Sequence, residues 1–98
     1  MDNAALVSNA CILVAAYYHL EAIDQQESCF FGQAKEKACL ALGYASLAGD
    51  CMRIASIDHL LQDIGLTPTE ITSLRELGKV SAVEALGTMP ASFWFRYN

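Results

Sequence analysis

The stretch "DIGLTPTEI", residues 63–71, decides the fold because it ends one helix and begins another within a few residues. Gly65 can adopt the left-handed backbone conformation that closes a helix. Thr67, Pro68 and Glu70 then fill the N-cap, N1 and N3 positions of the next helix. A corner of this kind is typical of a compact helical domain, and it is also the geometry of a helix-turn-helix.

Two long helices are predicted before this corner. The first runs from a cap at Asp2 or Asn3 to about Ile23, and the second runs from about Glu27 to Ala48. Apolar residues recur along the first helix at spacings of three and four, in two adjacent seams that call for neighbours on two sides. The first seam is Leu6, Ala10, Leu13, Tyr17 and Leu20, and the second is Val7, Cys11, Val14 and Tyr18. A row of alanines on the second helix lets another helix approach it closely.

After residue 49 the predicted units are shorter. Residues 56–65, 67–78 and 81–87 each read as a short helix closed by a glycine, and Ser81 with Glu84 repeats the capping pattern. Leu77, Val80 and Val83 are expected to face the core with the other apolar residues of this half. The sequence therefore predicts one all-α domain over residues 1–98, a small helical bundle. Two long N-terminal helices are followed by about three short helices and an aromatic tail.

The composition indicates surface that a partner covers. Hydrophobic residues make up 54% of the 98 residues and charged residues 17%, and the mean hydropathy is +0.29, which is high for a small monomer. If one chain does not cover both seams of the first helix, we expect a homodimer with Tyr17 or Tyr18 near its interface.

The aromatic tail offers a second candidate for partner binding. Neighbouring residues of an extended segment point to opposite sides, so Phe93 and Phe95 are expected inward, with Trp94 and Arg96 outward. Trp and Arg are enriched at interface hot spots. The alternative is that the whole tail covers the helices as a lid.

The charge disfavours nucleic acid as a partner. The net charge is -5, from 6 Lys and Arg against 11 Asp and Glu, and binding to a phosphate backbone requires a basic surface. Contact with an anion would have to use Arg53, Arg75, Lys79 or Arg96.

Neither export nor membrane insertion is expected. No Lys or Arg precedes the first apolar run, which is unlike a signal peptide. The uninterrupted apolar run, residues 10–18, is much shorter than the roughly 20 residues that span a bilayer. The sequence therefore predicts a cytoplasmic protein.

No catalytic, cofactor-binding or metal-binding pattern is found. Cys11, Cys29, Cys39 and Cys51 lack the close paired spacing of a zinc site, which favours reduced thiols over a disulfide or a metal centre. His59 lies one turn before Asp63, but no serine or cysteine is placed as an obvious nucleophile. The sequence predicts a protein that is not an enzyme.

The segment "MRIASIDHLLQDIGLTPTEI", residues 52–71, resembles the YjiS-like family of small bacterial proteins of unknown function. The family pattern has the form L-x-x-L-x-D-x-x-L-x-D-I-G-L-T-R-x-x-I, and Pro68 stands where the pattern has arginine. The matching residues are Asp58, Leu61, Asp63, Ile64, Gly65, Leu66, Thr67 and Ile71, and Ile54 and Ile57 each lie one residue after the first two leucine positions of the pattern. The resemblance implies the fold of the corner and, from some family members, a link to RNA and to bacterial regulation.

These observations favour a small non-enzymatic protein, bacterial or from a phage, that acts as a regulator, adaptor or inhibitor by binding another protein. The alternative is an RNA-associated post-transcriptional regulator of the YjiS-like kind.

Overall fold

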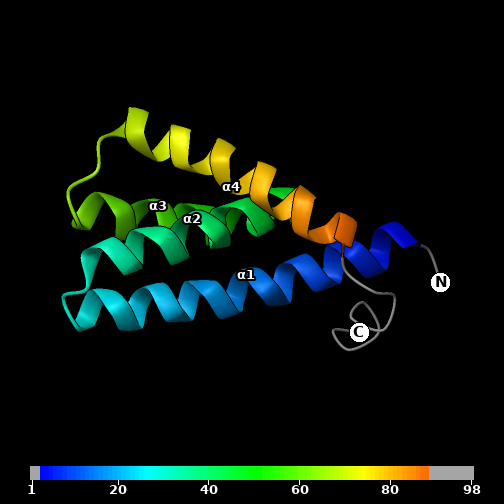
Figure 1. The fold of residues 1–98 in the computed structure, drawn as a ribbon, viewed down its shortest axis with the longest axis horizontal. Helices are drawn as coiled ribbons and strands as arrows, with labels where there is room; N and C mark the ends of the chain where they lie inside the picture. Colours follow the sequence, from blue (N-terminus) through cyan, green and yellow to red (C-terminus); the bar gives the residue numbers. More distant parts are fainter. Residues whose placement is uncertain (1–2, 89–98) are drawn as a thin grey trace.

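The computed structural model describes residues 3–88, and these residues form four helices and no strand (Figure 1). The helices are α1 (Asn3–Glu27), α2 (Phe31–Ala48), α3 (Cys51–Asp63) and α4 (Pro68–Thr88). The all-α prediction is confirmed. The aromatic tail, with Trp94 and Arg96, lies outside the described residues.

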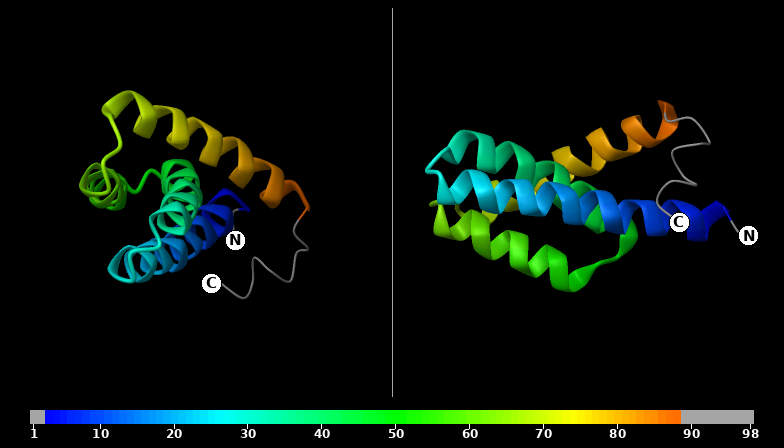
Figure 2. Two further views of the ribbon diagram at one scale, coloured as in Figure 1. Left: turned by 60° about the vertical axis from the view of Figure 1, so that its left-hand side comes forward. Right: turned by 90° about the horizontal axis from the view of Figure 1, so that it is seen from below.

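Helix α2 is the centre of the bundle and packs against the other three helices. Figures 1 and 2 show α1 running back along α2, and α3 lying on another side of it. Helix α4 runs in the same general direction as α2 and crosses it.

The turn between α1 and α2 lies later in the chain than the sequence predicted. The polar residues after Ile23 continue α1 to Glu27, and α2 begins only at Phe31. The amide of Phe30 donates to the carbonyl of Gln25 at 2.8 Å, and the amide of Cys29 donates to Gln26 at 3.0 Å. This pair of hydrogen bonds is a Schellman motif, and it places Cys29 at a positive φ of 62°.

Cys29→Gly is expected to stabilise the fold by about 1 kcal/mol, because glycine adopts the left-handed conformation without the steric penalty of a Cβ atom. Urea denaturation of the variant and the wild type measures the difference. An unchanged or lower free energy of unfolding would contradict a left-handed Cys29.

The predicted start of the third helix at Ser56 is wrong, since α3 begins at Cys51. Gly49 closes α2 at a φ of 68°, and Asp50 serves at once as the N-cap of α3. The Asp50 side chain accepts a hydrogen bond from the Arg53 amide at 3.2 Å. Because Asp50 caps the helix, α3 begins more than one turn earlier than the predicted start at Ser56.

The corner at residues 63–71 is built as the sequence predicted. The amides of Gly65 and Leu66 donate to the carbonyls of Gln62 and Leu61, and Gly65 has a φ of 101°. The Thr67 amide donates to Glu70 Oε1 at 3.0 Å, and the Glu70 amide donates to Thr67 Oγ1 at 3.2 Å. These two bonds are a reciprocal capping box, and the bond from the Thr67 backbone lowers the pKa of Glu70.

The prediction of two helices after the corner is wrong, because α4 continues through Gly78 and Ser81 to Thr88. Gly78 is a contact point and not a helix end. A Cβ atom on Gly43 would overlap the carbonyl group of Gly78, and one on Gly78 would overlap the carbonyl oxygen of Cys39. The backbones of α2 and α4 therefore touch at this crossing, which only glycine permits.

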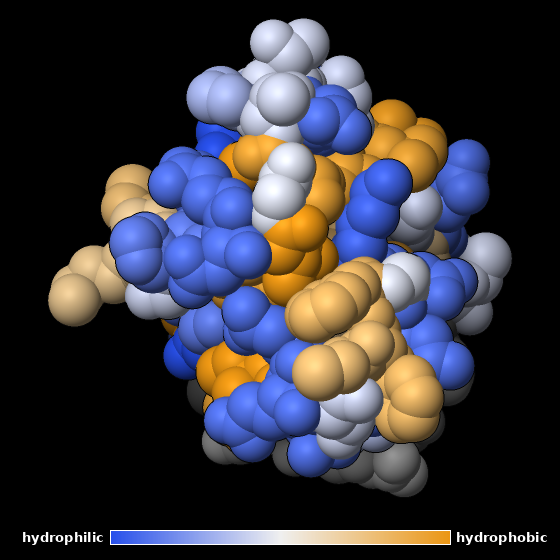
Figure 3. Space-filling view, turned by 90° about the vertical axis from the view of Figure 1, so that its left-hand side faces the viewer, coloured by the Kyte–Doolittle hydropathy of each residue, from blue (hydrophilic) through white to orange (hydrophobic). Residues whose placement is uncertain are grey.

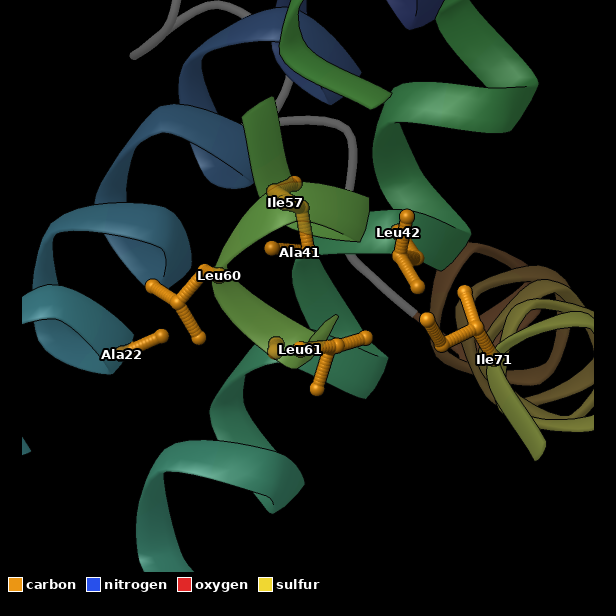
Figure 4. Close-up of a cluster of buried hydrophobic side chains, with 8 residues drawn as sticks. Ala22, Ala41, Leu42, Ile57, Leu60, Leu61 and Ile71 are labelled. Carbon is orange, nitrogen blue, oxygen red and sulfur yellow. The ribbon is translucent and has the colours of Figure 1, made fainter. Parts of the chain in front are cut away.

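The core consists of two clusters that share α2. Figure 4 shows the first, in which side chains from all four helices converge. The second joins Cys11, Val14 and Ala15 of α1 to Tyr44, Ala45 and Ala82. Leu77, Val80 and Val83 belong to neither cluster and are exposed, which contradicts their predicted place in the core.

Candidate protein-binding surfaces

A groove lies between α2 and α4 beside the glycine crossing. Where the helices touch, the Cys39 thiol donates to the Leu74 carbonyl oxygen at 3.2 Å and holds the two helices together. The groove has a volume of about 430 Å³, which is within the range of ligand pockets. We call it the α2–α4 groove, and its lining residues are Gly32, Lys35, Glu36, Cys39, Leu40, Leu74, Leu77 and Ser81.

The groove combines an apolar lining with charge. Leu40, Leu74 and Leu77 supply large apolar side chains, and Lys35 and Glu36 supply one charge of each sign. A second hollow of about 270 Å³ shares Lys35, Leu74 and Leu77 and extends along α4 to the capping box. Such an arrangement suits an apolar side chain with polar groups beside it.

An exposed apolar row on α4 adjoins the groove. Leu77, Val80 and Val83, which we call the α4 row, expose 59%, 56% and 56% of their surfaces. No residue in the described part of the chain covers them. This row was not predicted from the sequence, because Gly78 was expected to end a helix. The sequence feature that could have revealed it is the pair of small residues Gly78 and Ala82, whose spacing of four is typical of a continuous helix packed closely against another helix.

The two tyrosines predicted to bind a partner have different surroundings. Tyr17 is 59% exposed on the outer face of α1. Tyr18 is half-buried and stacks on Tyr44, with ring centroids 6.0 Å apart and planes 22° apart. Tyr17 is thus available to a partner, whereas Tyr18 is mainly a packing residue.

Tyr17 is held in place by a polar network. Its hydroxyl is hydrogen-bonded to Glu21, whose Oε2 lies 3.2 Å from Lys37 Nζ on α2. The hydrogen bond from Tyr17 lowers the pKa of Glu21, and the same bond raises the pKa of Tyr17. Lys37 Nζ also lies 5.6 Å from the centre of the Tyr18 ring. An aromatic side chain held this way loses less entropy on binding.

A second network links α1 to the start of α3. Arg53 contacts Asp50 Oδ2 at 3.3 Å and His19 Nδ1 at 3.0 Å. Because arginine can only donate, Nδ1 of His19 accepts and the ring is neutral. Burial lowers the pKa of His19, and the charge of Arg53 lowers it further.

Acidification is therefore expected to weaken the fold through His19. The native state binds fewer protons than the unfolded state once the pH falls below 6.5, the ordinary pKa of histidine. The free energy of unfolding should decline from pH 6.5 down to the lowered pKa. Denaturation across this pH range measures the slope, and His19→Gln should make the slope shallower. An equal slope in both proteins would contradict a neutral, half-buried His19.

Most of the cations in the described residues are already paired. Arg53 contacts Asp50, Arg75 lies 2.6 Å from Asp58, and the two lysines Lys37 and Lys79 contact Glu21 and Glu76. Arg75 thus reaches α3, whereas a helix-turn-helix would direct it outward. Only Lys35 among the five described cations lacks an ion pair.

The thiols of the described chain are free, and two are buried. Burial raises the pKa of Cys11 and of Cys39, so neither forms a reactive thiolate readily. Within residues 3–88 no group of acidic, histidine and cysteine side chains could hold a metal ion. His59 and Asp63 are both exposed on α3.

The end of the molecule that carries the two turns also exposes apolar area. Figure 3 views this end and shows hydrophobic patches between polar side chains. Phe30 and Phe31, at the turn between α1 and α2, contribute exposed rings.

Helix α1 is long and apolar enough, from Ala5 to Glu27, to cross a membrane by length and composition alone. The buried central helix of a soluble protein meets the same criterion. One side of α1 is packed in the second core cluster, through Cys11, Val14 and Ala15.

No protein-family model, curated protein or solved structure matches this chain. The resemblance to the YjiS-like family therefore stays a prediction.

Proposed function

We propose that this chain is a small cytoplasmic, non-enzymatic regulator, adaptor or inhibitor that binds another protein at the α2–α4 groove. One observation carries the proposal: an apolar groove continues into the exposed α4 row. Leu77 belongs to both. A contiguous apolar area of this kind on a small protein is typical of an interaction surface.

The charge of the described surface supports a basic partner. Ion pairs occupy four of the five described cations, whereas several carboxylates have no cation. Glu36 lines the groove together with the unpaired Lys35, and Glu84 is exposed next to Val83, so the acidic surplus lies on the surface around the groove. The occupant that fits is a protein segment with an apolar anchor flanked by Lys or Arg.

The same pairing argues against the RNA-associated alternative. Arg53, Arg75 and Lys79 would have to leave Asp50, Asp58 and Glu76 before they could neutralise phosphates. The inert buried thiols and the scattered titratable groups likewise support a role without catalysis.

Selection from a random peptide library displayed on phage tests this function. We expect enriched peptides with one or two large apolar residues next to Lys or Arg, and at least about tenfold weaker binding to Leu77→Glu. Met52→Glu is the matched control, because Met52 is 85% exposed on α3, away from the groove. Peptides that bind the wild type and Leu77→Glu equally, or that are acidic, would contradict the proposal.

A further inference from the structure

The outer face of α1 forms a second apolar surface, separate from the groove. Leu13, Ala16 and Leu20 follow each other at spacings of three and four, so they form one line along the helix. Leu13 is 46% exposed and Leu20 is 66% exposed, with Ala16 half-buried between them. Ile12 and Tyr17 flank the line on its two sides. No residue in the described part of the chain covers this face.

We infer that a second copy of this chain covers it, with the two α1 helices antiparallel and Leu20 of each copy packed against Ala16 of the other. The inference is independent of the groove and goes beyond the proposed function. In this register Leu20 of the first copy packs on Ala16 of the second, and Leu20 of the second packs on Ala16 of the first. The two-fold axis relates these two layers of contacts. The pairing is complementary to itself about the two-fold axis, and Leu20 is the leucine to be covered because it is 66% exposed, against 46% for Leu13.

The charges on α1 select the antiparallel orientation. Asp24 and Glu27 lie near the C-terminal end of the helix and are exposed. A parallel pair would bring these carboxylates next to their own copies, which is repulsive. An antiparallel pair places them beside the N-terminal half of the partner helix, which has no acidic residue from 3 to 20.

A bilayer fits this face less well than a second copy. The opposite side of α1 is already packed against Tyr44 and Ala45 of α2. The second half of the helix also makes polar contacts, from Glu21 to Lys37 and from His19 to Arg53. Lipid would have to replace these contacts, whereas a second copy leaves them intact.

Sedimentation equilibrium tests the inference. A pair of 25-residue helices buries less area than a standard protein interface, so measurements should extend to high micromolar concentration. The wild type should approach twice the mass of the 10.6 kDa chain. Leu20→Glu and Ala16→Lys should each sediment as monomers, and Met52→Glu should still dimerise.

Mixing the two monomeric variants tests the register. In the antiparallel pair, the new lysine of Ala16→Lys faces the new glutamate of Leu20→Glu, while the other layer keeps its native Leu20 and Ala16. The mixture should therefore dimerise, as neither variant does alone. Circular dichroism confirms that both variants are folded.

Three results would overturn the inference. The first is a monomeric wild type at high micromolar concentration, including one that instead sediments with phosphatidylcholine vesicles. The second is a dimer that survives Leu20→Glu. The third is a mixture of the two variants that stays monomeric, because a parallel pair would not bring the new charges together.

Discussion

Gly78→Ala is expected to destabilise the fold by about 3 kcal/mol, because the added methyl group has no room at the crossing of α2 and α4. The new Cβ atom would overlap the Cys39 carbonyl oxygen and lie 3.0 Å from the Gly43 nitrogen. Both obstacles are backbone atoms, which cannot move aside as a side chain can. The two helices would have to separate, and the Cys39 to Leu74 hydrogen bond would lengthen. Guanidinium denaturation measures the loss.

The chain offers matched controls for this substitution. Gly32 lies in α2 and Gly87 lies in α4, and a Cβ atom on either would meet nothing within 4 Å. Gly32→Ala and Gly87→Ala should therefore raise the free energy of unfolding by up to about 1 kcal/mol, since alanine favours the helix. If Gly78→Ala were as stable as these two variants, the backbone contact between α2 and α4 would be refuted.

Leu61→Ala is also expected to cost about 3 kcal/mol, because Leu61 is fully buried where the four helices converge (Figure 4). The same change at Leu77 should cost less than about 0.5 kcal/mol, since most of that side chain is exposed. Thermal and urea denaturation of the two variants give the comparison.

The comparison bears on function as well as on stability. A small cost at Leu77 would mean that the fold does not require a large side chain there, which leaves the residue available to a partner. A cost at Leu77 equal to that at Leu61 would place Leu77 in the core and remove the exposed α4 row.

The corner at residues 63–71 could be predicted because its cause is local. A glycine at positive φ and a Thr67 to Glu70 capping box act within one turn of the chain, so their pattern can be read without the tertiary structure. The end of α1 was missed because Cys29, and not a glycine or an asparagine, takes the left-handed position.

The path of α4 could not be predicted from local signals. Gly78, Ser81 and Glu84 read as the end of one helix and the start of the next, yet all three lie inside one helix. A glycine is required at position 78 because the backbone there packs directly against the backbone at Gly43, which lies 35 residues earlier in the chain. That requirement appears only once the two helices are packed.

The candidate binding residues also fall into two groups, those that could be predicted from one helix and those that depend on how two helices pack. The exposure of Tyr17 was anticipated from the excess of apolar residues on α1. The groove was not, because its walls come from two helices whose crossing point was unknown. Leu77 and Val80 looked like core residues for the same reason.

Site-specific photo-cross-linking in cells of the native host tests the central claim, that the α2–α4 groove binds another protein. Leu77 is replaced by p-benzoylphenylalanine, and Gln62, an exposed residue of α3, is replaced in the control. We expect one discrete adduct to a different protein from position 77 and none from position 62. An adduct to RNA at position 77, or no adduct from folded protein, would contradict it.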